Sequence, residues 1–396
     1  MTQCVPGFLR PDPRSRARNC IGAIVLRAIA IGVMILSATP VHAQSVRVLI
    51  AAHQLQTVVA SEGGVVVRAA DAPSGAPLLE PEITTVMDVR PQAAGLLLAG
   101  AVSAGDRVWV APLLDSPLVV DGRTYRGAVW IERDADGTLD VINELDLEQY
   151  LYGVVGVEMD PTWPEVALQA QAIASRSYAV ARAALHTYPD YDVKAGELDQ
   201  AYGGVNAESQ GAVDAVESTR GVVLTYRYRV INAYYSSCDG GYTADGTELS
   251  DPQPYLHAQP DPYAAESPHL SWSADVPIAA FARAFQEQMG DVGDITAVTA
   301  GPADASGRLI SVTIAGTSGS RTIPAPIFRQ LAGRHLVQST RIASLGIKGD
   351  SIEVRGSGFG HGVGMSQWGA KDMADQGLGI TAILSFYYRG AMLSKI

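Results

Sequence analysis

Cysteine is nearly absent from this chain of 396 residues, and positive charge is scarce. Beyond residue 43 the only cysteine is Cys238, so that part of the chain cannot form an internal disulfide. The same part carries 24 Lys and Arg against 40 Asp and Glu. A balance this acidic argues against nucleic acid or an anionic membrane surface as a partner.

Motifs of several well-known site types are missing as well. The chain has no His-Glu-x-x-His, no paired Cys-x-x-Cys and no Gly-x-Ser-x-Gly, which weakens zinc protease and serine hydrolase interpretations. The glycine-rich stretch GSGFGHGVGMSQWGA (356–370) matches neither the dinucleotide fingerprint nor the P-loop. Its glycines favour tight turns, positive φ, or close approach of backbone to a ligand. The alternative is a glycine-rich hairpin in which His361 is a core residue.

The first 43 residues differ from the rest. Four arginines between residues 10 and 18 precede an uncharged apolar run, AIAIGVMILSA (28–38). Val41 and Ala43 then occupy the −3 and −1 positions of a possible cleavage site, so residues 1–43 are predicted to be a secretory signal. An uncleaved N-terminal membrane anchor is the alternative, because the apolar run extends back to Ile21 with only Arg27 interrupting it.

The remaining pattern predicts a mixed α+β fold without internal repeats. Strands are expected over 45–71, 107–113, 125–146 and 221–238, with turns at residues 63–64 and 134–137. A short helix is expected at DLEQYLYGVV (146–155) and a long one at 161–186, starting near Pro164 and Glu165. Short helices follow at 278–289 and 324–334, a strand at 307–316, and two final helices, the first of which stops at Gly377. We expect a β-rich region over 44–124 and one large domain over 125–390.

Two positions are candidates for chemistry. Glu158 ends the apolar stretch Leu151–Val157, and an apolar environment raises the pKa of a carboxyl group, as a general acid near neutral pH requires. The alternative is a carboxylate exposed just past a strand end. Cys238, followed by Asp239 and two glycines, could be a nucleophile, a metal ligand or a small core residue.

Five segments, in order, resemble the SpoIID/LytB family, which includes stage II sporulation protein D and amidase enhancers. The segments are EQYLYGVVGVEMDPTWPEVALQAQAIASRSYAVAR, DQAYGG, STRGVVLTYRYRVINAYYSSCDGGYT with PYLHAQPDPY, and GSGFGHGVGMSQWGA. The resemblance covers about residues 125–390. It implies a lytic transglycosylase that cuts peptide-stripped peptidoglycan glycan and leaves 1,6-anhydro-N-acetylmuramyl ends.

The resemblance also assigns roles to residues. It places the family's catalytic glutamate on Glu158, and the arginine and tyrosine of the following helix on Arg176 and Tyr178. Ser177 stands where the family usually has Thr, and Gly156-Val157 where it often has Pro-Ser. The other expected substrate-binding residues are those of the glycine-rich motif and a tryptophan: Gly360, His361, Gly362, Ser366, Gln367 and Trp163. Trp368 is a further candidate for stacking on a sugar.

One carboxyl group suffices for this reaction, because the 6-hydroxyl of the sugar is the nucleophile. Asp160 is the nearest second carboxylate, and we expect it to shape a turn. Some family members hold zinc through Cys and His. Here only Cys238 matches in type and place, so no cofactor is expected, with zinc as the alternative. The resemblance leaves a second function open, that of a non-catalytic peptidoglycan-binding enhancer of a partner amidase.

Overall fold

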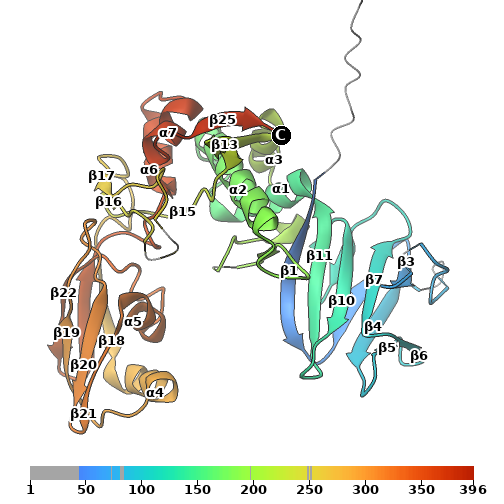
Figure 1. Ribbon diagram of the computed structural model, residues 1–396, viewed down its shortest axis with the longest axis horizontal. Coiled ribbons are helices and arrows are strands. Elements are labelled where there is room, and N and C mark those ends of the chain that lie inside the picture. The colour runs from blue at the N-terminus through green and yellow to red at the C-terminus, as the bar shows by residue number, and fades with distance from the viewer. Residues whose placement is uncertain (1–43, 73, 81–83, 197, 248, 250–251) are drawn as a thin grey trace, which may run out of the picture. The chain divides into compact units, whose positions relative to one another are not determined.

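The computed structural model describes residues 44–72, 74–80, 84–196, 198–247, 249 and 252–396 (Figure 1). The predicted signal segment, residues 1–43, lies outside the described residues. Within the described ranges, no helix combines the length and the apolar character needed to cross a membrane. Residues 43–396 form one compact unit, and the elements below belong to it.

Two antiparallel-rich sheets of six strands form the first part of this unit. The first sheet has the order β12-β1-β11-β10-β7-β3, and the second has the order β6-β5-β4-β2-β8-β9. Alternate valines and leucines of both sheets are buried in one core cluster, as expected for strands with one face inward. The strands of the first sheet are β1 (Ser45–Gln54), β3 (Val65–Ala69), β7 (Arg107–Pro112), β10 (Ala128–Arg133), β11 (Leu139–Asp146) and β12 (Val193–Lys194). Those of the second are β2 (Thr57–Ala60), β4 (Val86–Pro91), β5 (Leu96–Leu98), β6 (Val102–Ala104), β8 (Leu118–Val120) and β9 (Arg123–Tyr125).

The first of these sheets spans the domain boundary expected at residue 124. Strands β1 and β7, from the region before residue 124, pair directly with β11 and β10 from the region after it. The β-rich region and the start of the expected large domain therefore share one sheet. The pairing of β1 with β11 joins residues about 100 positions apart, which strand patterns along the chain do not indicate.

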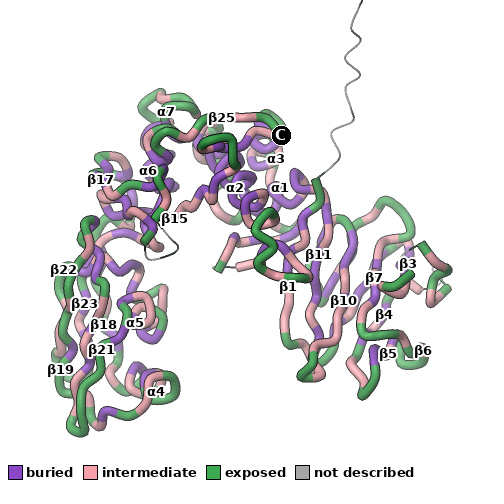
Figure 2. Tube along the Cα trace, viewed as in Figure 1, coloured by how far each residue is buried: buried purple, intermediate pink, exposed green. Residues whose placement is uncertain are grey.

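Three helices follow this sheet: α1 (Leu147–Glu158), α2 (Glu165–Leu185) and α3 (Gln210–Ser218). The Asp146 side chain caps α1 by accepting from the backbone N–H groups of Glu148 and Gln149. Pro164 precedes α2, and His186 closes it in the left-handed conformation. Helix α2 packs against α1, α3, α6 (Gln367–Asp375) and α7 (Ile380–Tyr387), and it is buried along most of its length (Figure 2). Both helices expected in this region are confirmed, and α1 extends to Glu158.

Short strand pairs bring distant segments next to α2. Strand β15 (Tyr235–Ser236) runs parallel to β24 (Met365–Ser366), so the tyrosine-rich segment lies beside the end of the glycine-rich motif. Strand β13 (Val222–Tyr226) pairs with β14 (Arg229–Val230) and with β25 (Met392–Lys395), and β16 (Tyr242–Thr243) pairs with β17 (Gln259–Pro260). A 3-10 helix, Gly204–Ala207, packs against α1.

A second hydrophobic core lies within residues 272–354. Its two three-stranded sheets have the orders β18-β23-β22 and β19-β20-β21. Helices α4 (Ile278–Met289) and α5 (Ala325–Ala332) carry the phenylalanines of this core, Phe281, Phe285 and Phe328. The strands are β18 (Trp272–Pro277), β19 (Ile295–Ala300), β20 (Ser311–Gly316), β21 (Gly319–Pro324), β22 (Ile342–Lys348) and β23 (Ser351–Gly356). The predicted α+β class and the helices expected at 278–289 and 324–334 are confirmed.

Candidate active site

Glu158 is the last residue of α1, where three other segments meet its carboxyl group. Its Oε1 accepts a hydrogen bond from the backbone N–H of Ala201 at 2.8 Å, and its Oε2 accepts one from Gln367 Nε2 at 3.3 Å. The Tyr235 hydroxyl also bonds the carboxylate. The parallel pairing of β15 with β24 explains why Tyr235 and Gln367 reach the same group. Glu158 is therefore held by neutral donors from three separate parts of the sequence.

Burial raises the pKa of the Glu158 carboxyl. The hydrogen bonds from Ala201, Gln367 and Tyr235 stabilise the carboxylate and oppose this effect, but they do not cancel it. The position at the C-terminal end of α1 works in the same direction as burial, since the partial negative charge of a helix end disfavours an anion. Glu158 thus keeps its proton to a higher pH than an ordinary glutamate, as the apolar sequence before it predicts.

Amide side chains orient the groups around Glu158. Gln367 is buried, and its Nε2 also lies 3.4 Å from Gln171 Oε1. Gln200 Nε2 donates to the Tyr235 hydroxyl at 2.9 Å, and Tyr150 donates to Gln200 Oε1 at 3.2 Å. The sequence analysis assigned no role to Gln171, Gln200 or Tyr235. Gln200 and Tyr235 do stand inside the DQAYGG and YYSS segments that carry the resemblance, which was the available signal.

A pocket of about 240 Å³ lies beside Tyr235. Tyr178 lines it, and its hydroxyl donates to Asp199 Oδ1 at 2.6 Å. Burial is the main cause that raises the pKa of Tyr178, so the hydroxyl stays protonated. The full set of lining residues combines tyrosines with charged and apolar side chains: Tyr178, Leu198, Asp199, Tyr234, Tyr235, Leu249, Pro326, Arg329, Arg334 and His361. Tyr178 and His361, both expected at the site, are brought together here.

His361 enters this pocket as a neutral ring. Its Nδ1 accepts a hydrogen bond from the Val363 backbone N–H at 2.9 Å. Burial, together with the smaller effects of the positive charges of Arg308 and Arg329, lowers the pKa of His361 to about 3. The ring therefore stays uncharged at physiological pH, with Nε2 carrying the proton. The donors to Glu158 described above do not include His361.

The glycines of the 356–364 segment serve packing within the chain. A side chain at Gly362 would lie 1.8 Å from Arg308 Nη2, and one at Gly360 would lie 2.6 Å from Ser236 Cβ. Their backbone N–H groups donate to Ser236 Oγ and to the Gln338 carbonyl, respectively. The expected role of these N–H groups in sugar binding is corrected, because they are already used inside the protein.

Two other expected ligand contacts are corrected by burial. Arg176 has no accessible surface, and its guanidinium bonds the Glu148 carboxylate at 2.6 and 2.9 Å and the Val222 carbonyl at 2.9 Å. Ser366 is also fully buried and caps α6 by accepting from Gly369 N–H. Neither side chain can touch a sugar in this structure. Gln367, with 4 % of its surface exposed, acts through Glu158.

Trp163 and Trp368 lie against one another, with ring centroids 4.8 Å apart and planes at 62°. Both are partly exposed, and Lys371 lies over the Trp368 ring. Trp163 precedes α2, and Trp368 is the second residue of α6, directly after Gln367. Asp160, two residues after Glu158, accepts from the Thr162 N–H and hydroxyl, so the expected turn is confirmed. Stacking of a sugar on either tryptophan stays a prediction.

Cys238 is fully buried and exchanges backbone hydrogen bonds with Phe359. Burial raises the pKa of its thiol, which disfavours the thiolate needed by a nucleophile.

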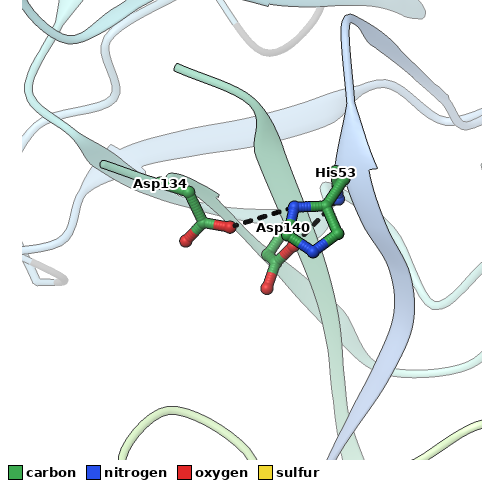
Figure 3. A group of neighbouring side chains, drawn as sticks. All are labelled: His53, Asp134 and Asp140. Atoms are coloured by element: carbon green, nitrogen blue, oxygen red, sulfur yellow. Dashed lines mark hydrogen bonds and ion pairs between the residues drawn. The ribbon is translucent and has the colours of Figure 1, made fainter. Parts of the chain in front are cut away.

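Within the described residues, the one group of three possible metal ligands is His53, Asp134 and Asp140, where β1 meets the β10–β11 turn (Figure 3). Asp140 stands near the start of β11, whereas α1 follows the end of that strand, so this group is separate from the Glu158 site.

Comparison with known proteins identifies one matching family model and several similar proteins. A model of the SpoIID family, described as stage II sporulation protein, matches residues 135–226, which include Glu158, Arg176 and Tyr178. Stage II sporulation protein D of Bacillus subtilis (strain 168) is 30% identical over 282 residues, covering 64% of this chain and 76% of that protein. Its counterpart from Bacillus amyloliquefaciens is 29% identical over 278 residues, covering 64% of this chain and 76% of that protein. The amidase enhancer of Bacillus subtilis (strain 168) is 28% identical over 296 residues, covering 62% of this chain and 40% of that protein. On these matches, and with the motifs in the same order, the chain belongs to the SpoIID family.

Proposed function

We propose that this protein is an exported lytic transglycosylase that cleaves peptide-stripped peptidoglycan glycan, with Glu158 as its single acid and base. The environment of the Glu158 carboxyl is the main observation in support of this proposal. Its carboxyl has a raised pKa and neutral hydrogen-bond partners, and the neighbouring Tyr235 lines a pocket. Such a group keeps its proton to a higher pH than an ordinary glutamate and can return to the carboxylate when the proton is used.

The reaction needs one proton transfer in each direction. Glu158 donates its proton to the glycosidic oxygen as the bond from that oxygen to C1 of the muramyl sugar breaks. The Glu158 carboxylate then takes the proton of the C6 hydroxyl as O6 attacks C1. The product is a 1,6-anhydro ring, the displaced sugar keeps the first proton, and Glu158 is protonated again without consumption of water.

Two other carboxylates, Asp160 near Glu158 in the sequence and Asp199 in the pocket lining, are engaged elsewhere, which supports a mechanism with one acid. Ordinary glycosidases place two carboxyl groups on either side of the bond that breaks. Asp160 is engaged in a turn with Thr162. Asp199 accepts from the Tyr178 hydroxyl and the Lys194 N–H, and it pairs with Arg182 at 3.3 Å. Neither is arranged as a partner for Glu158, whereas the C6 hydroxyl of the substrate supplies the nucleophile.

The test is the identity of the product. Protein lacking residues 1–43 is incubated with purified glycan freed of stem peptides, and the ends formed are identified by mass spectrometry. Anhydromuramyl ends are expected from the wild type and almost none from Glu158→Gln, which keeps size and hydrogen bonding but cannot donate a proton. Reducing ends from the wild type would mean hydrolysis and would require a second carboxylate.

A second candidate function has one specific observation in its favour, the relative named amidase enhancer. In that case the protein would bind glycan and stimulate a cell-wall amidase without cutting the strand itself. Wild-type protein that yields no new ends but accelerates such an amidase would establish this alternative. Either function places the protein outside the cytoplasmic membrane, in line with the signal pattern over residues 1–43.

A further inference from the structure

A cavity of about 630 Å³ lies on the first six-stranded sheet and shares no lining residue with the pocket beside Tyr235. Strand β7 contributes Trp109, the loop after β7 contributes Leu114, and the first turn of α1 contributes Gln149. We call this cavity the Trp109 pocket. Its volume falls in the range of about 300–1,000 Å³ that is typical of ligand sites.

Trp109 lies on the face of the sheet that is turned away from the core. Its neighbours Val108 and Val110 are fully buried, and successive residues of a strand alternate between the two faces. On the outer face, Trp109 pairs with Trp130 of β10 and with Arg68 of β3. The Arg68 guanidinium lies 5.6 Å from the centroid of the Trp109 ring, and this contact helps to hold the ring in place. A large ring is thus kept half-exposed at a pocket, where packing of the core does not require it.

Polar groups without protein partners line the pocket together with this ring. The side chains of Trp109, Gln149 and Ser45 form no hydrogen bond with another residue of the described ranges. Glu144 also lines the pocket, and its Oε2 accepts from the Trp130 indole N–H at 2.7 Å, which leaves Oε1 for a ligand. The pocket therefore offers both donors and acceptors of hydrogen bonds beside an aromatic surface.

The charges of the lining disfavour an anion. Asp115 and Glu144 carry two negative charges, and Arg126 carries one positive charge. This arginine already bonds both carboxylate oxygens of Glu208 at 2.7 Å. A phosphate or carboxylate ligand would find no unpaired cation here and would meet two like charges. An uncharged ligand that is rich in hydroxyl and amide groups fits this lining.

A sugar ring has this chemistry. The C–H groups on the face of a pyranose pack against an aromatic ring, and the hydroxyl and acetamide groups at its edge donate and accept hydrogen bonds. In peptidoglycan, uncharged N-acetylglucosamine units alternate with the muramyl sugars. Resting on the proposed function, we propose that the Trp109 pocket is a second sugar-binding site, which takes an N-acetylglucosamine unit of the glycan strand away from the bond that breaks.

Two segments connect this pocket to the Glu158 site. Gln149 and Glu158 belong to the same helix, α1, and lie about 14 Å apart along its axis at the usual helical rise. The N–H of Ala201 bonds Glu158, and Val205, four residues later, lines the Trp109 pocket. A strand of several sugars is long enough to reach both places. Binding of a remote sugar then helps to position the bond that reacts.

The experiment observes the indole groups of the five tryptophans directly. The Glu158→Gln protein lacking residues 1–43, isotopically labelled in its tryptophans, is titrated with tetra-N-acetylchitotetraose and followed by NMR. This probe is an uncharged chain of four N-acetylglucosamine units. The Trp109 indole signal, identified as the one lost in Trp109→Phe, should shift and saturate. The signal of Trp272, whose buried indole donates to the Gly358 carbonyl, reports whether each variant is folded.

Two variants measure the contribution of the lining. Gln149→Ala should weaken the binding reported by the Trp109 signal about 2- to 10-fold, the value of one neutral hydrogen bond. Gln288→Ala, which removes an exposed glutamine from α4, is the matched control and should leave this affinity unchanged. In the protein that retains Glu158, Trp109→Ala should raise KM for long glycan strands by about 10-fold and leave kcat close to that of wild type, because the ring does not touch the reacting atoms. If Trp109→Ala fails to fold, Gln149→Ala decides the question.

The outcomes separate this site from the proposed reaction. A Trp109 signal that stays in place while those of Trp163 and Trp368 move would overturn the site, because the sugar would then bind elsewhere. A Trp109 signal that responds to a stem peptide with a free amino group, but not to the sugar probe, would also overturn it, as would unchanged affinity in folded Gln149→Ala. A saturable response of Trp109 in a protein whose wild type yields no anhydro product would leave the site standing and remove the lytic function. Anhydro product together with an unresponsive Trp109 would overturn the site alone.

Discussion

The two ends of helix α1 carry the same residue in opposite surroundings. Glu148, in the first turn, lies beside the positive helix end and forms three hydrogen bonds of 2.6–3.2 Å with the guanidinium of Arg176. Glu158, in the last turn, lies at the negative end and is bonded by the Ala201 N–H, a glutamine amide and a tyrosine hydroxyl. The comparison teaches that the partners of a glutamate decide its role. A cation makes Glu148 part of the framework, whereas neutral donors leave Glu158 able to exchange a proton.

Replacement of Glu158 and of Glu148 by glutamine should give the largest effects, and the two effects should differ in kind. Glu158→Gln should lower cleavage by about 10²–10⁴-fold with little loss of stability, because it removes the proton but keeps the hydrogen-bonding shape. Glu148→Gln should lower the free energy of unfolding by about 3–5 kcal/mol, because Arg176 would stay buried without its carboxylate. Urea unfolding and product analysis per folded molecule measure the two effects. Equal activity of Glu158→Gln and wild type would show that the site is on another residue.

The loss of His361 should have a smaller effect, confined to activity. The ring lines the pocket and accepts only one backbone N–H, from Val363, among the hydrogen bonds described above. His361→Ala should therefore lower kcat/KM about 2- to 10-fold, the value of one neutral hydrogen bond, and should change the melting temperature little. With its pKa at about 3, His361 should add no limb to the pH profile between pH 5 and 9. A large fall in melting temperature with unchanged activity would instead make His361 a core residue.

The pH dependence of kcat/KM tests how the Gln367 amide affects the pKa of Glu158. The proposed cleavage needs protonated Glu158, so kcat/KM should fall as pH rises through the raised pKa of this group. The Gln367 amide stabilises the carboxylate and lowers that pKa, so Gln367→Leu should move the alkaline limb to higher pH. Since the folded pKa exceeds the unfolded one, the contribution of Glu158 to stability is present at low pH and is lost as pH rises through the folded value. Gln169→Leu on the partly exposed side of α2 is the matched control, and a limb that stays in place for both variants would contradict the role of Gln367.

The sequence predicts local features of this molecule better than its long-range contacts. Glu158 could be found because its apolar neighbours precede it directly, and α2 and α4 because their apolar spacing and flanking prolines are local. The roles of Arg176 and Gly362 could not be found in this way. Arg176 is paired with a carboxylate 28 positions away on another helix, and Gly362 is required by the position of Arg308, more than 50 residues earlier. The same holds for Gln367, which reaches Glu158 across 209 positions.

Substitution of Cys238 should have the smallest effect of all. Its backbone exchanges hydrogen bonds of 2.7 and 3.0 Å with Phe359, which any residue except proline can make. Its thiol lies near the Ser267 hydroxyl. Serine at this position can keep that hydrogen bond, so Cys238→Ser should lower stability by about 1 kcal/mol and should leave cleavage per folded molecule within about twofold of wild type. The proposed mechanism has no covalent enzyme intermediate and therefore needs no thiolate. Metal analysis of the purified protein accompanies the assay. Complete loss of activity in a folded variant, together with stoichiometric zinc in the wild type, would make Cys238 a metal ligand.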